Sequence, residues 1–149
     1  MEIMGIWDKV SKMADSITPD ALSENKRVAR YMIIGLAYVT AADGEVDANE
    51  KEYAKNFVRS QRDIIKYFAE AEAMVVFDEN LDLALKSHQI QMFKAECMRL
   101  ASETSKKITT KDYRVSILSA MERMSVNNDR GVAGNHESEV LNLWRSKLL

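Results

Sequence analysis

The chain has 149 residues, which suits one domain and leaves too little sequence for two ordinary ones. Its 21 Lys and Arg residues against 23 Asp and Glu residues give a net charge of −2, so no overall basic field favours nucleic acid as a partner. The single cysteine, Cys97, excludes an internal disulfide and a cysteine-based zinc cage.

Turn-forming residues are scarce, with one proline and five glycines in the whole chain. Because few windows alternate strictly between apolar and polar residues, we predict an all-α protein, a single compact bundle of about seven helices spanning residues 1–149. The longest mostly apolar run, residues 32–42, is far shorter than the roughly 20 residues that span a bilayer. The N-terminus shows no signal-peptide pattern, so the expected location is the cytoplasm.

The first predicted elements are a leader helix and a central helix. Residues 1–17 form the leader, with an amphipathic stripe over residues 3–15 that is expected to dock onto the bundle. Pro19 suits the first turn of the second helix, which runs to Ala42. This helix is apolar almost all round over residues 31–39, which predicts that it is buried at the centre of the bundle.

The middle of the chain predicts three further helices. The third begins at Asp47, and the fourth follows the capping-box pattern of residues 60–63. The fifth is capped by Asp78 and runs to Leu100, and it could break near Ser87.

The last part of the chain predicts two more helices and a loop. Thr109 or Thr110 caps the sixth helix, since either can accept from the first free N–H groups. Residues 125–136 are polar and contain glycine, so they predict a loop. Residues 137–149 carry apolar positions at helical spacing and predict the final helix.

One stretch concentrates negative charge. Residues 43–52 hold five carboxylates and one lysine. The spacing of Asp43, Gly44, Val46 and Glu50 matches the second half of an EF-hand loop, in which the last glutamate binds calcium through both oxygens. The first half is missing, because apolar residues stand where its ligands belong, and a complete EF-hand is excluded.

A plain structural interpretation of this stretch is equally open. Asp47 with Glu50 forms a capping box that needs no ion. Asp43 and Gly44 are typical of a turn between helices. Carboxylates in a first helical turn are also stabilised by the positive end of the helix dipole.

A second loop repeats the pattern imperfectly. Asp129 and Gly131 are separated by Arg130, and the glutamate that opens the next helix, Glu137, falls one residue late. The guanidinium of Arg130 could occupy the space of a cation. Glu139 follows on the same helix.

These residues resemble the tellurite-resistance TerB family and TerB-like domains. The first family motif is close to complete at Ala42, Asp43, Gly44, Val46 and Glu50, with Lys51 after it, and the Trp7-Asp8-Lys9-Val10 leader is also similar. The resemblance implies an all-helical single domain in which two pseudo-repeated Asp-Gly loops lie near each other. It covers most of the chain, but only the first motif is specific.

The resemblance also implies a cation site and a cellular role. Carried over by position, the ligands are Asp43, Glu50, Asp129 and Glu137, with Asp47 and Glu139 as secondary candidates. Oxygen ligands favour calcium or magnesium over zinc. The family implies a stress-response role at or near the inner membrane surface, through assemblies with other proteins.

Three further side chains are of types that can act as metal ligands, bases or nucleophiles. His88 lies on an apolar helical stripe, which is more typical of a hydrogen-bonded core residue than of a metal ligand or general base. His136 is expected at the surface beside the second acidic loop. Cys97 shares a helical face with Ile90 and Phe93, which indicates a core residue and not a nucleophile.

We therefore expect a non-enzymatic protein that binds calcium or magnesium and acts through protein partners. The alternative is a helical interaction module in which the same loops are only caps and turns. A metal-dependent hydrolase would need a companion base and a substrate clamp, and the sequence supplies neither.

Overall fold

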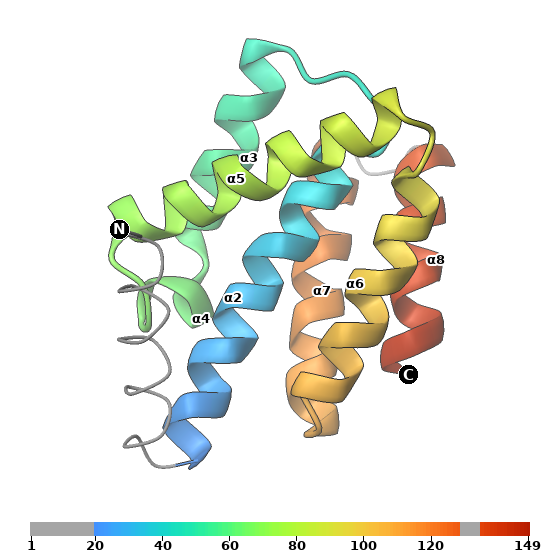
Figure 1. Cartoon of the computed structure of the whole chain (residues 1–149). Helices are drawn as coiled ribbons and strands as arrows, with labels where there is room; N and C mark the ends of the chain where they lie inside the picture. Colours follow the sequence, from blue (N-terminus) through green and yellow to red (C-terminus); the bar gives the residue numbers. More distant parts are fainter. Residues whose placement is uncertain (1–19, 129–134) are drawn as a thin grey trace, which may run out of the picture.

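The computed structural model describes residues 20–128 and 135–149, which form seven α-helices and no strand (Figure 1). This confirms the prediction of an all-α bundle. The helices are α2 (Asp20–Thr40), α3 (Ala48–Ser60), α4 (Arg62–Ile65), α5 (Glu70–Gln89), α6 (Phe93–Lys107), α7 (Lys111–Asn128) and α8 (Asn135–Leu148). The predicted leader helix, Pro19, Asp129 and Arg130 lie outside the described residues.

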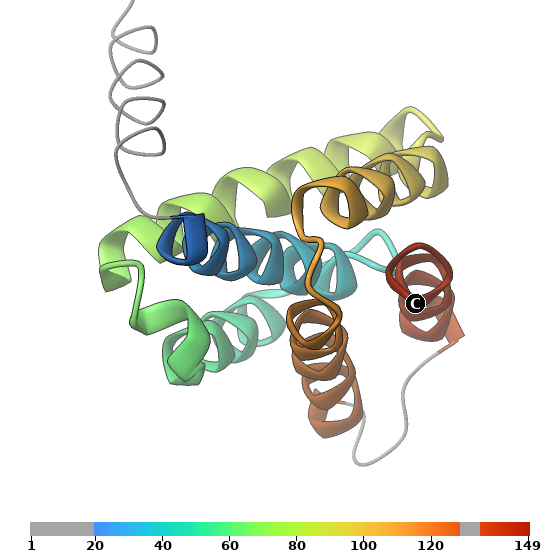
Figure 2. The ribbon, with the colours of Figure 1, turned by 90° about the horizontal axis from the view of Figure 1, so that it is seen from below.

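Helix α2 occupies the centre of the bundle, as its apolar sequence predicted. It contacts each of the other six described helices, and Figure 2 shows them arranged around it. Nearly every side chain from Tyr31 to Val39 is buried. Gly35 allows α7 to approach closely, because a Cβ there would lie only 2.7 Å from the sulfur of Met121.

The other helices pack around α2 and also against one another. Figure 1 shows α5 crossing α2, while α6 and α8 pack together and α7 packs against both α2 and α8. A partly buried hydrogen bond of 2.7 Å, donated by the hydroxyl of Tyr31 to Glu103, connects α2 to α6. No described helix is long and apolar enough to cross a membrane.

Several helix boundaries predicted within residues 61–100 were wrong. The fourth predicted helix is divided in the structure, because α4 is a single turn and α5 begins at Glu70. Asp78 caps nothing: it lies inside α5, and its carboxylate is 3.2 Å from the ammonium of Lys55 and 3.8 Å from that of Lys51, both on α3. Gln61, and not Ser60, holds the N-cap position of α4, without a side-chain capping hydrogen bond.

The fifth predicted helix does break near Ser87, since α5 ends at Gln89 and α6 begins at Phe93. Gln91 adopts a left-handed backbone with φ 59°, and the N–H of Met92 donates to the carbonyl of Ser87 at 2.7 Å. This six-residue closure is a Schellman end, which usually places glycine at the left-handed position. Since the helix has ended, Ile90 is 70% exposed and does not share the core face of Cys97.

The loop predicted at residues 125–136 was wrong at both of its ends, which are helical. Helix α7 continues to Asn128, since Met124 and Ser125 are still buried, and α8 begins at Asn135. The start of the sixth predicted helix was correct: the carbonyl of Thr110 accepts from the first turn of α7.

Candidate functional site

The acidic loop, residues 41–47, follows directly from the end of α2. The N–H of Gly44 donates to the carbonyl of Ala41 at 3.0 Å, and Gly44 has φ 86°, a conformation that glycine adopts without strain. The carboxylate of Asp43 accepts from the N–H of Glu45 at 3.0 Å. Val46 is partly buried against the core. The predicted Asp-Gly turn is therefore present, and it is closed by its own backbone and by Asp43.

The start of α3 is a capping box, as the sequence predicted. The carboxylate of Asp47 accepts from the N–H of Glu50 at 2.7 Å, and the carboxylate of Glu50 accepts from the N–H of Asp47 at 3.4 Å. These two hydrogen bonds satisfy backbone donors that a helix end leaves free. They explain both carboxylates without an ion.

The three carboxylates of this segment influence one another. The N–H of Glu50 lowers the pKa of Asp47 by stabilising its ionised form. Burial raises the pKa of Glu50, the N–H of Asp47 lowers it, and the nearby charges of Asp47 and Asp43 raise it again, so the net direction is upward. The segment therefore holds like charges close together, which is the electrostatic condition that a bound cation would relieve.

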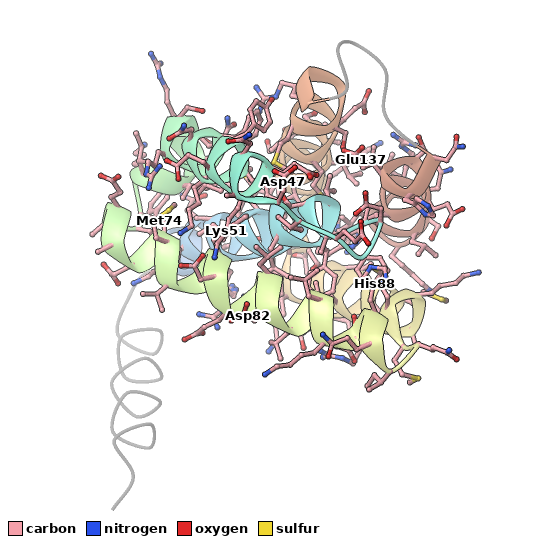
Figure 3. All side chains as sticks on the ribbon, turned by 90° about the horizontal axis from the view of Figure 1, so that it is seen from above. Asp47, Lys51, Met74, Asp82, His88 and Glu137 are labelled. Atoms are coloured by element: carbon pink, nitrogen blue, oxygen red, sulfur yellow. The ribbon has the colours of Figure 1, made fainter. Side chains whose placement is uncertain are left out.

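Glu137 brings the start of α8 to the same end of the bundle. Burial raises the pKa of Tyr53, on α3, and the charge of Glu137 raises it further, so the two side chains are near each other. Figure 3 shows Asp47 and Glu137 at this end. Glu139 instead lines a pocket beside the acidic loop, and Asp129 lies outside the described residues.

The predicted ligands do not assemble into a formed metal cage. Within residues 20–128 and 135–149, no three His, Cys, Asp or Glu side chains are grouped so that they could hold an ion. Asp43, Asp47 and Glu50 are hydrogen-bonded to the backbone of their own loop. The cation site therefore stays a prediction, and Asp43, Asp47, Glu50 and Glu137 are its described candidates.

His88 connects the acidic loop to the rest of the bundle. Its Nε2 donates to the carbonyl of Ala41 at 2.7 Å, which confirms the expected hydrogen bond, although the side chain is only half-buried. The ring stacks on Phe93 with centroids 3.8 Å apart, and Phe93 stacks in turn on Tyr38 at 5.8 Å. A Cβ on Gly44 would lie 3.3 Å from the His88 ring. Three helices thereby support the turn of the loop.

A pocket of about 600 Å³ opens beside this stack. The loop contributes Ala42, the end of α5 and the start of α6 contribute His88 and Phe93, and α8 contributes Val140 and Leu143. Polar groups on its rim include Lys94, His136 and Glu139. His136 is exposed, as expected, but it faces this pocket.

Cys97 is a core residue, as predicted. Its side chain is fully buried, and burial raises the pKa of the thiol to about 12. At neutral pH the thiolate that a nucleophile needs is therefore scarce.

Comparison with protein families, with curated proteins and with solved structures gave no match. The structure supports an all-α bundle of seven described helices, and the resemblance to TerB rests on the sequence motif alone.

Sequence reasoning missed the pocket. His88 and His136 were predicted separately, and the expected break near Ser87 did not indicate how α5, α6 and α8 pack together. The available signal was the sequence Gln89-Ile90-Gln91-Met92, whose polar residues interrupt the apolar stripe where α5 ends.

Proposed function

We propose that this protein is a non-enzymatic, TerB-like stress-response protein that binds calcium or magnesium at its acidic end and acts through protein partners. The observation that carries the proposal is the arrangement of three carboxylates, Asp43, Asp47 and Glu50, on one Asp-Gly turn and the first helical turn after it. Burial and the charges of Asp47 and Asp43 raise the pKa of Glu50, which agrees with this crowding. Divalent cations bind carboxylate oxygens, and binding would remove this repulsion. Glu137, beside Tyr53, is the candidate ligand from α8.

The TerB motif itself supports the proposal residue by residue. Gly44 has the positive φ that the motif's glycine allows, Val46 anchors the loop to the core, and Glu50 opens α3. In this proposal Asp129, from the second loop, completes the ion site. The bound ion would hold the two loops together and shape a surface for the partner, at or near the inner membrane.

A helical interaction module without a metal site is the second candidate. The capping box and the Asp43 turn favour it, because each carboxylate already accepts a backbone N–H. In this case the partner would dock on the bundle itself, and no ion would matter.

A titration of chelator-treated protein with calcium and with magnesium separates the two candidates. Calorimetry and thermal unfolding of the wild type would be compared with Asp43→Asn, Glu50→Gln and Glu137→Gln. Asp82→Asn is the matched control, since Asp82 is an exposed carboxylate on α5 (Figure 3). Saturable binding with a raised unfolding midpoint, weakened in the three variants and kept in the control, supports the cation proposal. No heat and no shift at millimolar ion supports the interaction module.

A further inference from the structure

The pocket beside His88 has the size and composition of a small-molecule site. Its volume of about 600 Å³ lies within the range of such sites, which combine an apolar interior with a few placed polar groups. Figure 3 shows His88 near one end of the bundle, where the loop, α5, α6 and α8 meet. None of the four described candidates for the cation site lines this pocket, so the two sites are separate.

One wall of the pocket is aromatic and is held by contacts within the bundle. The rings of His88 and Phe93 are nearly parallel, with an interplanar angle of 16°, and the Ala41 carbonyl holds His88 in place. Ala42 and Val140 are buried and line the pocket. Such a surface favours a bulky apolar group, because burying apolar surface away from water is favourable.

Two opposite charges line the same pocket from different helices. Lys94 lies on α6 and Glu139 on α8. Among the described residues, neither side chain forms an ion pair with another, whereas Arg145 on α8 pairs with Glu122. The pocket therefore presents a cation and a carboxylate to a ligand, one from each helix.

The strained turn of the chain also lies here. Gln91 lines the pocket with φ 59°, the only positive φ of a non-glycine residue in the part of the chain that the structure describes. A left-handed conformation costs energy for any residue with a Cβ, and such strain is concentrated at functional sites. The Schellman end would accept glycine, but glycine would remove a side chain that lines the pocket.

From these features we infer that the pocket binds a small zwitterion with an apolar side chain, which is the chemistry of an apolar amino acid or dipeptide. The ligand's carboxylate pairs with Lys94 and its ammonium pairs with Glu139. Its side chain lies against the Phe93 wall and Leu143. Since the opposite charges of the pocket match both ends of such a ligand, a plain acid or a plain amine would satisfy only one of them.

The test is calorimetry on the full-length protein with L-leucine, L-phenylalanine and the dipeptide Leu-Phe. Two half-ligands, 3-phenylpropionate and 2-phenylethylamine, each lack one charge. We expect a zwitterion to bind at least tenfold more tightly than either half-ligand, which corresponds to about 1.4 kcal/mol. If the free amino acids bind more tightly than the dipeptide, the ligand is an amino acid. If the dipeptide binds more tightly, the ligand is a dipeptide. Amide chemical shifts at Gln91 and Leu143 would locate binding in this pocket.

Variants make the result specific to the two charges. Lys94→Gln and Glu139→Gln should each weaken binding of the zwitterion at least tenfold. Lys147→Gln on α8 and Glu79→Gln on α5 are matched controls, because both residues are exposed and neither lines the pocket. Absence of saturable binding at about 10 mM ligand, equal affinity for the half-ligands, or full binding in both pocket variants would overturn the inference.

Discussion

Helix α2 and the acidic loop that follows it are neighbours in sequence but are held by different forces. Ile33, Leu36 and Ala37 on α2 are fully buried and contribute through burial of apolar surface. In the loop, Asp43 and Asp47 are exposed, and hydrogen bonds to the backbone define the conformation. Burial of apolar surface therefore stabilises the helix, whereas local hydrogen bonds to the backbone define the loop.

The largest expected effect is in the helix. Leu36→Ala should lower the free energy of unfolding by about 2–5 kcal/mol, because it leaves a cavity beside fully packed neighbours. The matched control is Leu83→Ala on α5, where the side chain is 55% exposed. This variant should change the free energy of unfolding by less than about 0.5 kcal/mol. Urea unfolding measures both. Similar losses in the two variants would contradict the central role of α2.

The next effect tests the turn between the two regions. Gly44→Ala should cost about 1–2 kcal/mol, because alanine is strained at φ 86° and its Cβ would lie 3.3 Å from the His88 ring. Gly44→Asn is the control, since asparagine tolerates the left-handed region better and should lose less. If alanine and asparagine are equally well tolerated in urea unfolding, the described turn is incorrect.

The two regions should also respond to opposite extremes of pH. Burial raises the pKa of Tyr38, on α2, to about 12. The unfolded chain then loses this proton before the folded protein does, so stability is complete below pH 10 and falls as the pH rises towards 12. Thermal unfolding midpoints measured across this interval should fall less steeply in Tyr38→Phe than in the wild type. An identical slope would show that Tyr38 does not contribute.

The smallest effect concerns the cap of α3. Asp47→Ala should lower the unfolding midpoint by about 3 °C at neutral pH, because the hydrogen bond to the N–H of Glu50 is lost. The pKa of Asp47 is lowered, so this stabilisation is present above its ordinary value of 3.8 and disappears as the pH falls below it. Asp63→Ala on α4, an exposed carboxylate, is the control. A pH-independent difference would contradict the capping role.

Prediction from the sequence succeeded where the interacting residues are close together in the chain and failed where they lie on different helices. The capping box of Asp47 and Glu50 was predicted correctly, because both partners lie within one helical turn. The helix at Asp78 was predicted wrongly, because an acidic residue before an apolar run suits an N-cap as well as it suits a mid-helix ion pair with Lys55. Only the packing of α3 on α5 distinguishes these two roles.

The candidate site shows the same division. The sequence placed Asp43, Gly44 and Glu50 on one loop, and the structure confirms their local geometry. It did not predict that His88 would support this loop from 47 positions away, nor that Lys94 and Glu139 would line one pocket. These arrangements depend on how whole helices pack, and no local pattern encodes them.

By itself the sequence determined the helical class, the burial of α2 and the acidic Asp-Gly turn, since each depends on periodicity or on neighbours within a few residues. The tertiary structure alone decided that Asp78 pairs with α3 and that a pocket opens between α6 and α8. The physical reason is that helix-to-helix packing couples residues far apart in the chain, and their relative placement follows from the shape of the whole core.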